Sequence, residues 1–360
     1  MTRILTIDIG AGTMDVLCAD LESGEHFKAV VKSPVRTVVE RLEELDGDLV
    51  ILGGEMGGGA ITRVLEEKAR SVEVAMSASA AATVHHDVER VRSIGIRVLE
   101  NEQARELAES GKCQTLDLWD VEEDRLRRIV ESFGVPFAFD VIGVCAQDHG
   151  VAPKGISHLD FRHGAIKLIL DETPFPHALL HRGADVPHHM NRLRSIAASA
   201  ASLPAGEVYV MDSGMAAILG ASMDPRVRSR TRALVLDIAT SHTVGAALQG
   251  EEICGFFEYH TKDVTLARLE TLVRELADGS LEHARLLAEG GHGAYTRRGF
   301  GFDRVEIILA TGPKRSLIRG SSLPIALGAP LGDNMMTGTV GLLEAIRKRK
   351  GLEPMSGDGG

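Results

Sequence analysis

The chain opens with three short apolar segments separated by glycine or polar turns, a pattern that predicts a meander of β-strands. Apolar residues then recur at helical spacing from Pro34 to Leu45. The segment 48–52, apolar from Leu49 to Leu52, predicts a buried strand, and a helix is expected over 61–69 after a glycine loop. The three opening strands are predicted at residues 4–9, 14–20 and 26–32.

The same order of elements returns in the second half of the chain. Three strands are predicted there, at residues 233–238, 243–249 and 253–259. Helices over 264–277 and 281–288 and a strand over 305–310 follow. The repeat predicts an α/β protein with two domains of duplicated topology, each holding a mixed five-stranded sheet.

The domain boundaries follow from this repeat. The first domain is expected to span residues 1–206, with an insertion at about 71–136, and the second to span 207–337. A terminal helix over 338–350 should return to the first domain, and 351–360 reads as a flexible tail. The insertion is predicted to contain strands 72–76 and 96–99 and helices 81–93 and 121–132, before a strand at 139–146.

Each opening strand of the repeat ends in an aspartate, Asp8 or Asp237. The first is followed by a turn of Gly10, Ala11, Gly12 and Thr13, and the second by Ala239, Thr240 and Ser241. One interpretation is a plain β-hairpin whose glycines supply positive φ. The other is a phosphate-binding turn, in which backbone N–H groups and hydroxyls approach phosphate oxygens and the aspartates hold a metal ion.

Charge and composition argue against several classes of binding partner and cofactor. The 360 residues carry a net charge of -11, which argues against a nucleic-acid or anionic-membrane surface. The chain starts directly on a strand and has no apolar run of membrane-spanning length, so a cytoplasmic protein is expected. The four cysteines, Cys18, Cys113, Cys145 and Cys254, are scattered without a Cys-x-x-Cys spacing, which argues against a thiolate-held cluster.

Two further aspartates lie at predicted strand ends. Asp148 follows the strand at 139–146, and Asp212 stands between a strand and the small-residue helix Ser213–Gly220. Either carboxylate can orient water or accept a proton, and either can equally cap a helix.

In order and spacing these motifs resemble the actin-like ATPase superfamily, which includes sugar kinases, heat-shock chaperone ATPases and actin. The first phosphate loop of that superfamily is similar to residues 8–13, the second to residues 236–241 without its usual glycines, and the adenosine motif to Thr311, Gly312 and Pro313. More narrowly, the chain resembles a family of actin-like proteins labelled as pyruvate formate-lyase activating enzyme. Activators of that kind are radical S-adenosylmethionine enzymes with a three-cysteine motif, which this sequence lacks.

The resemblance implies two ribonuclease H-like domains with ATP in the cleft between them. It also implies Mg²⁺ held by Asp8 and Asp237, and catalytic roles for Asp148, Asp212 or Asp237.

Two features fall outside these motifs. The loop GGEMGGGAIT, with Gly53, Gly54, Gly57 and Gly58, precedes a helix and is a candidate substrate or anion site, or else a flexible turn. Seven histidines lie between His149 and His189; His149 is a candidate substrate contact. His177 and His181 would share a helical face and could bind a metal ion, although solvated histidines are as common.

Three functions remain open: an ATP-dependent phosphotransferase acting on a small molecule, a conformational ATPase acting on a protein partner, and a nucleotide-binding scaffold without turnover. The phosphotransferase or ATPase is favoured. The altered second turn at Ala239–Ser241 bears more on hydrolysis than on binding.

Overall fold

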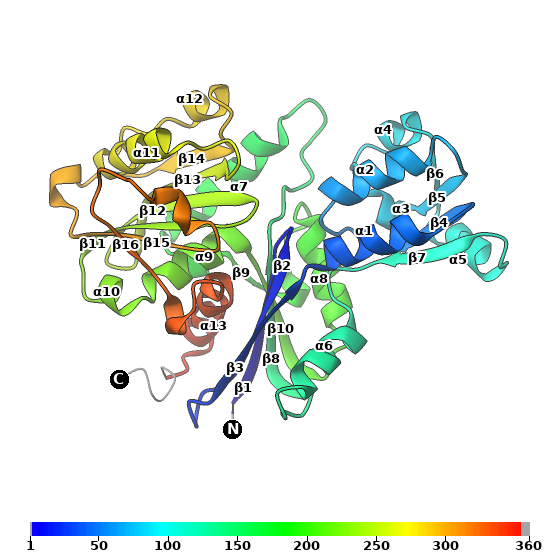
Figure 1. The fold of residues 1–360 in the computed structure, drawn as a ribbon, viewed down its shortest axis with the longest axis horizontal. Helices are drawn as coiled ribbons and strands as arrows, with labels where there is room; N and C mark the ends of the chain where they lie inside the picture. Colours follow the sequence, from blue (N-terminus) through cyan, green and yellow to red (C-terminus); the bar gives the residue numbers. More distant parts are fainter. Residues whose placement is uncertain (1, 354–360) are drawn as a thin grey trace.

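The computed structural model describes residues 2–353, in which two six-stranded sheets and a smaller four-stranded sheet are arranged with helices between and around them. In Figure 1 the first sheet runs through the centre, the second lies on the left and the small sheet lies on the right. None of the helices in this part of the chain combines the length and the apolar content that crossing a bilayer requires.

The first sheet has the order β3-β2-β1-β8-β10-β9. Its strands are β1 (Arg3–Ile9), β2 (Thr13–Asp20), β3 (His26–Lys32), β8 (Phe139–Ala146), β9 (Leu180–Arg182) and β10 (Ala205–Asp212). The second sheet has the order β14-β13-β12-β11-β15-β16. Its strands are β11 (Arg232–Ile238), β12 (His242–Gln249), β13 (Glu252–His260), β14 (Gly293–Thr296), β15 (Ile307–Thr311) and β16 (Ile325–Leu327).

The two sheets share one topology. In each, three antiparallel strands are followed by two parallel ones, so that β3, β2, β1, β8 and β10 correspond to β13, β12, β11, β15 and β16. The opening strands β1 and β11 have the same length and the same sequence of buried and half-buried positions. The duplicated α/β fold is confirmed, but the prediction of five strands was wrong, because β9 and β14 each add an antiparallel edge strand.

The small sheet corrects the predicted assignment of the strand at 48–52. It is wholly parallel, with the order β6-β5-β4-β7, and β4 belongs to it, whereas β8 is the parallel neighbour of β1. Its strands are β4 (Leu49–Gly53), β5 (Val74–Ser77), β6 (Ile96–Leu99) and β7 (Gln114–Leu118). The insertion therefore starts before residue 71, because an apolar run shows that a strand is buried but not which sheet it joins.

The helices of the insertion are α1 (Pro34–Glu44), α2 (Gly59–Lys68), α3 (Ala78–Ala81), α4 (Val88–Ser93) and α5 (Asn101–Glu109). The single helix predicted over 81–93 was wrong. The chain breaks after α3, and the side chain of Asp87 accepts a hydrogen bond from the backbone N–H of Glu89 (3.0 Å), so that α4 starts with its own N-cap.

Helices form layers on the faces of the two large sheets. Leu126 of α6 (Glu123–Glu131) and Leu193 of α8 (Asn191–Ala200) pack on one face of the first sheet. The other face shares a core with the second sheet through α7 (His158–Glu172), α9 (Ser213–Ser222) and α13 (Thr337–Lys350). Leu272 of α11 (Leu266–Asp278) and Leu286 of α12 (His283–Ala288) cover the outer face of the second sheet. The remaining helical turns are α10 (Pro225–Arg228), η1 (Pro176–Leu179), η2 (Gly183–Asp185), η3 (Phe302–Arg304), η4 (Arg315–Ile318) and η5 (Pro330–Gly332).

The boundary expected at residue 206 falls inside β10, which pairs with β8 of the first sheet. The chain leaves that sheet at Asp212 and enters α9, which packs on β11 and β12 of the second sheet. In return, α13 packs on β1 and β8 of the first sheet. The two helices cross between the sheets (Figure 1).

Glycines allow α9 and α13 to approach to backbone contact. A Cβ at Gly220 would lie 1.8 Å from the carbonyl oxygen of Thr337, and one at Gly341 would lie 1.8 Å from that of Ala216. A side chain on either residue would force the helices apart, and with them the two sheets.

We expect Gly341→Ala to lower the free energy of unfolding by about 1–3 kcal/mol or more, because the added methyl group meets the backbone of α9. Gly164→Ala in α7 is the matched control: no atom lies within 4 Å of its would-be Cβ, and alanine favours helix by roughly 0.5–1 kcal/mol. Urea denaturation measures both variants. Equal stability of Gly341→Ala and the wild type would contradict the close crossing.

Candidate functional site

A cavity of about 1160 Å³ lies between the duplicated domains. Its lining comes from the turn after β1, the turn after β11, the start of α13 and loops of the insertion. Most of the predicted site residues meet here. They are Asp8, Gly10, Ala11, Gly12, Thr13, Asp237, Ala239, Thr240, Ser241, Pro313, Gly57, Gly58 and His149.

The turns after β1 and β11 have the same backbone form. Gly10 donates its N–H to the carbonyl of Thr13 (3.0 Å), and Ala239 donates to the carbonyl of His242 (3.1 Å). Neither Gly10 nor Gly12 has positive φ. The strands β1 and β2 do form a hairpin around the first turn, but the expectation that its glycines supply left-handed backbone was wrong. The second turn has no residue with positive φ either, so it forms without glycine.

The absence of a side chain at Gly12 instead allows the first turn to approach the second closely. A Cβ there would lie 3.3 Å from Cγ2 of Thr240, so the first turn touches the second across the cavity. The two turns that were expected to bind phosphate thus lie directly against each other.

The period of two along a strand explains why Asp8 and Asp237 face each other. Ile4, on the Asp8 side of β1, packs into the core shared by the two sheets, and so do Ala233 and Val235 of β11. Asp8 and Asp237 therefore also point inward, each at the end of its strand, where the shared core gives way to the cavity.

A third carboxylate, Asp15, was missed by the motif analysis. Asp15 is directly opposite Asp8 in the β1–β2 register, lines the cavity and has no hydrogen-bond partner on Oδ1. The hairpin register could have revealed it, because residues opposite each other in a two-stranded ribbon share a face. In the second sheet, Val244 takes the equivalent place opposite Asp237.

The three carboxylates are close enough to perturb one another. Burial, followed by the charge of Asp8, raises the pKa of Asp15 to about 8 and that of Asp237 to about 7. Burial also raises the pKa of Asp8 to about 6, against an opposing hydrogen bond from Cys145. Carboxylates that repel one another at the edge of a cavity are stabilised by a cation between them.

Two glycines allow neighbouring backbone to pack closely against these carboxylates. A Cβ at Gly338, in the first turn of α13, would lie 2.0 Å from Oδ2 of Asp8. A Cβ at Gly312 would lie 2.7 Å from Oδ1 of Asp237. Thr311 is in register with Asp237 on the neighbouring strand. Thr311 and Gly312 thus lie behind Asp237 instead of lining the cavity as Pro313 does.

Asp148 and Asp212 do not line the cavity. Both are buried, and Asp148 accepts hydrogen bonds from the N–H groups of Gly150 (2.7 Å) and Leu193 (2.9 Å). Asp212 caps α9 by accepting from Gly214 (3.0 Å) and pairs with a guanidinium. These partners describe structural roles for both residues.

The guanidinium belongs to Arg162 of α7, which joins the two large sheets. Its Nη2 lies 2.7 Å from Oδ2 of Asp212, at the end of β10, and its Nη1 binds Glu258 of β13. Although burial opposes ionisation, the charge of Arg162 holds the pKa of Glu258 below its usual range. Sequence patterns gave no sign of this buried pair.

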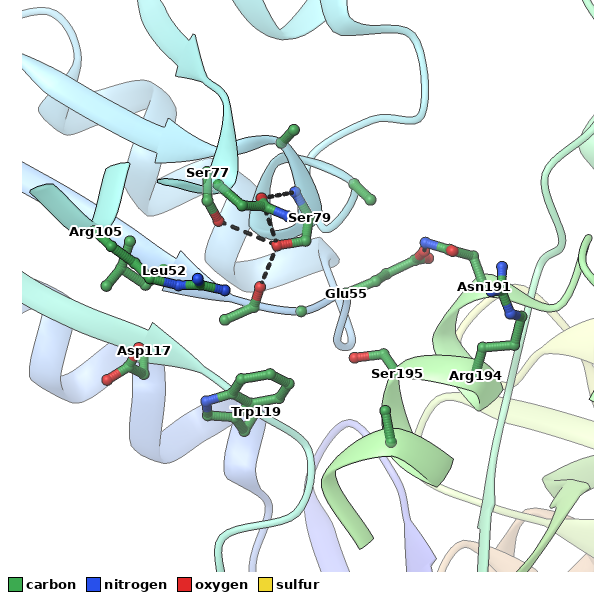
Figure 2. A pocket seen from close by; sticks show the side chains of 16 residues that line it. Leu52, Glu55, Ser77, Ser79, Arg105, Asp117, Trp119, Asn191, Arg194 and Ser195 are labelled. Carbon is green, nitrogen blue, oxygen red and sulfur yellow. Dashed lines mark hydrogen bonds between the residues drawn. The ribbon is translucent and has the colours of Figure 1, made fainter. Parts of the chain in front are cut away.

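A second pocket, of about 580 Å³, lies where the carboxyl ends of β4, β5 and β7 face α8 (Figure 2). Gly53 and Gly54 line this pocket, whereas Gly57 and Gly58 line the large cavity. Ser195 of α8 points toward Trp119 across the pocket. Carboxyl ends of parallel strands, at the point where the strand order reverses, are the usual ligand site of such sheets.

The two cavities meet at Glu55, which lines both. Its carboxylate accepts a hydrogen bond from Asn191 (2.5 Å) and lies 3.0 Å from Nε2 of His86. The predicted glycine loop thus separates the two sites and supplies residues to each.

The histidine pair proposed from sequence does not share a helical face. His177 lies in the short helix η1 and His181 in the strand β9. A different set comes together: His242, His260 and His292 have ring nitrogens within 4.8 Å of one another. His242 and His260 line the large cavity beside the second turn.

Solved structures share the overall course of the chain at low similarity. A ROK hexokinase from Thermus thermophilus matches 97% of this chain and 100% of its own at 13% identity and a TM-score of 0.33. AlfA from a Bacillus subtilis plasmid matches 95% and 98% at 10% identity and 0.37. The activator of 2-hydroxyisocaproyl-CoA dehydratase from Clostridium difficile, solved with bound ADPNP, matches 99% and 100% at 10% identity and 0.32. The strand order of the two sheets, and not these scores, establishes the duplicated fold.

No protein of curated function matches the sequence. One family profile matches the sequence over residues 56–317, which is most of the chain. The matched part includes the second turn, Arg162 with its two buried carboxylate partners, and the three clustered histidines. The chain therefore belongs to the family described as "Putative pyruvate format-lyase activating enzyme (DUF1786)".

Proposed function

We propose that this protein is an ATP-dependent phosphotransferase that binds Mg²⁺–ATP in the large cavity and a small polar acceptor in the adjoining pocket. The observation that carries the proposal is the pair of equivalent turns, each behind a strand-end aspartate, that meet across one cavity. At about 1160 Å³ the cavity is larger than most small-molecule sites, which leaves room for a nucleotide.

The turns would hold the phosphates. Backbone N–H groups of Gly12 and Thr240 and the hydroxyls of Thr13 and Ser241 can donate to phosphate oxygens from two sides. A nucleotide bound in this way contacts both domains, so it favours the closed arrangement by the difference between its affinities for the two states.

Asp8, Asp15 and Asp237 fit a magnesium ion. Their donors are hard carboxylate oxygens, and Oδ1 of Asp15 is buried without a partner. When bound, Mg²⁺ would neutralise the charge of the β- and γ-phosphates. Asp8 and Asp15 would bind the ion from the first sheet, and Asp237 would bind it from the second sheet.

The adjoining pocket favours transfer to an acceptor over simple hydrolysis. It offers hydrogen-bonding groups of both kinds, including Ser77, Asn101, Arg105 and Asp117, and it shares the lining residue Glu55 with the large cavity. A small hydroxylated or charged metabolite matches such a lining. The large cavity alone would serve a conformational ATPase equally well.

The positions of the cysteines argue against the iron–sulfur chemistry that the name of the family implies. Cys18 and Cys145 lie in the first sheet, Cys254 in the second and Cys113 beside the small sheet. Thiolates distributed over three sheets do not offer three ligands to one iron–sulfur cluster.

Measuring ADP release from Mg²⁺–ATP with and without a panel of small metabolites tests the function. Acceptor-dependent release supports a phosphotransferase. Slow release that no metabolite stimulates points to a conformational ATPase, and nucleotide binding without release points to a scaffold. Absence of ATP binding would refute the proposal.

Replacing Asp237 by Asn should weaken Mg²⁺-dependent ATP binding by roughly tenfold or more, which is about 1.4 kcal/mol. The change removes a charged metal ligand from one side of the cavity and leaves its shape intact. Asp263→Asn, at an exposed position after β13, is the control. Calorimetric titration with Mg²⁺–ATP measures both. Unchanged affinity in Asp237→Asn would mean that this aspartate is only a turn residue.

The raised pKa of Asp15 predicts a pH dependence of stability. The folded protein retains a proton on Asp15 up to about pH 8, whereas the unfolded chain releases it near pH 4. Raising the pH through this window therefore destabilises the metal-free protein. The amide introduced by Asp15→Asn stays neutral at every pH, so this variant should become progressively more stable than the wild type from pH 5 to pH 8.

Thermal unfolding midpoints of the wild type and Asp15→Asn, recorded without Mg²⁺ from pH 5 to pH 8, measure this effect. The difference between the two proteins is the informative quantity, because buried histidines such as His242, whose pKa burial lowers to about 4, titrate with the opposite sign. A difference that does not change with pH would contradict the prediction. Added Mg²⁺ should raise the midpoint of the wild type most at pH 8, where the carboxylates are ionised.

A further inference from the structure

We propose that the second domain contains a metal site of a second kind, at the wall of the large cavity. His242, His260 and His292 bind one divalent transition-metal ion there, such as Zn²⁺. The site is separate from the carboxylate cluster of Asp8, Asp15 and Asp237. It does not depend on whether the protein turns over ATP.

Three neighbouring strands bring the histidines together. His242 is the first residue of β12 and His260 the last of β13, and the two are directly opposite in the antiparallel register. Opposed residues of an antiparallel pair project from the same face with their Cβ atoms close together. His292 comes immediately before β14, and its N–H donates to the carbonyl of Glu258 (2.9 Å).

The ring geometry suits one ion. The ring centroids of His260 and His292 are 4.0 Å apart, and those of His242 lie 4.6 Å from His260 and 4.8 Å from His292. One nitrogen of each ring lies within 4.8 Å of one nitrogen of the others. Ligands placed around a tetrahedral zinc ion at about 2.0–2.1 Å stand roughly 3–3.5 Å apart, so small side-chain rotations close the site.

The rings also have unused nitrogens. Nε2 of His242 and Nδ1 of His292 are buried without a hydrogen-bond partner. A buried polar atom without a partner is destabilising, and a metal ion would satisfy both atoms at once. Burial lowers the pKa values of His242 and His292, which keeps these rings in the neutral form that binds metals.

The surroundings hold the set in place. Glu258 anchors the backbone of His292, while the carboxylate of Glu258 is fixed by Arg162 and Gln147. Because His242 and His260 line the cavity, an ion held by the three rings would direct its remaining coordination position toward the cavity. Three protein ligands and one open position are the arrangement of catalytic rather than structural zinc sites.

Imidazole nitrogen selects transition metals, whereas carboxylate oxygen selects Mg²⁺. The two sites of the cavity should therefore not compete for the same ion. A transition metal next to the turn at Ala239–Ser241 would offer an anchor for an oxygen of water, phosphate or acceptor.

Cobalt and zinc titrations of the untagged, chelator-treated full chain test the proposal. Co²⁺ bound to three histidines and a water should give visible d–d absorption near one equivalent, and Zn²⁺ should bleach this absorption, whereas a thousandfold excess of Mg²⁺ should not. His260→Gln should weaken Co²⁺ and Zn²⁺ binding at least tenfold. His188→Gln, which changes an exposed histidine, should bind as the wild type does.

Two further results make the test decisive. Asp237→Asn should keep its zinc affinity even where its Mg²⁺–ATP affinity falls, which separates this site from the nucleotide site. The far-ultraviolet circular dichroism of His260→Gln shows whether the variant folds, and the wild-type titration stands regardless of that result. Absence of Co²⁺ absorption and of Zn²⁺ binding at about 100 µM in the wild type, a concentration of the order at which weak sites fill, would overturn the proposal. Undiminished binding in His260→Gln would overturn it as well.

Discussion

The backbone contact between α9 and α13 sets the distance between the two large sheets, and the cavity depends on that distance. Gly220 and Gly341 let each helix meet the carbonyl oxygens of the other, so the layer between the sheets is as thin as two helices allow. Each sheet can then bring the end of its first strand to the same place. Wider packing would separate the turns that now touch at Gly12 and Thr240.

Given that spacing, the period of two along a strand determines the chemistry of the cavity. The covered inward positions are Ile4 and Thr6 in β1 and Ala233 and Val235 in β11. The next inward position of each strand is an aspartate, Asp8 or Asp237, at the edge of the cavity. Duplication alone would give a symmetric site. The asymmetry comes from the second strand, where Asp15 is opposite Asp8 but Val244 takes the equivalent place opposite Asp237, so the first domain contributes two of the three carboxylates.

Sequence patterns predicted the repeated strands, the strand-end aspartates and the two turns, because these depend on local periodicity and on which residues form turns. They did not predict which sheet β4 would join, because Leu49 to Leu52 reads the same in either sheet. Asp148 and Asp212 show a similar limit: a strand-end aspartate looks alike in the sequence whether it lines a cavity or is buried, and only the structure reveals the partners Leu193 and Arg162. His292 could not have been placed beside His242 without the pairing of β13 and β14.

The second turn shows that a departure from a sequence motif need not change the backbone form of the turn. Glycine in a phosphate loop serves either positive φ or close approach, and neither turn here has positive φ at its glycines or their counterparts. Close approach is already provided by Gly12 on the opposite side, so Thr240 can keep its side chain and contact Gly12 with it. The N–H of Ala239 closes the turn on the carbonyl of His242, while Thr240 and Ser241 each keep a backbone N–H and add a hydroxyl. The ring of His242, directly after them, belongs to the histidine cluster.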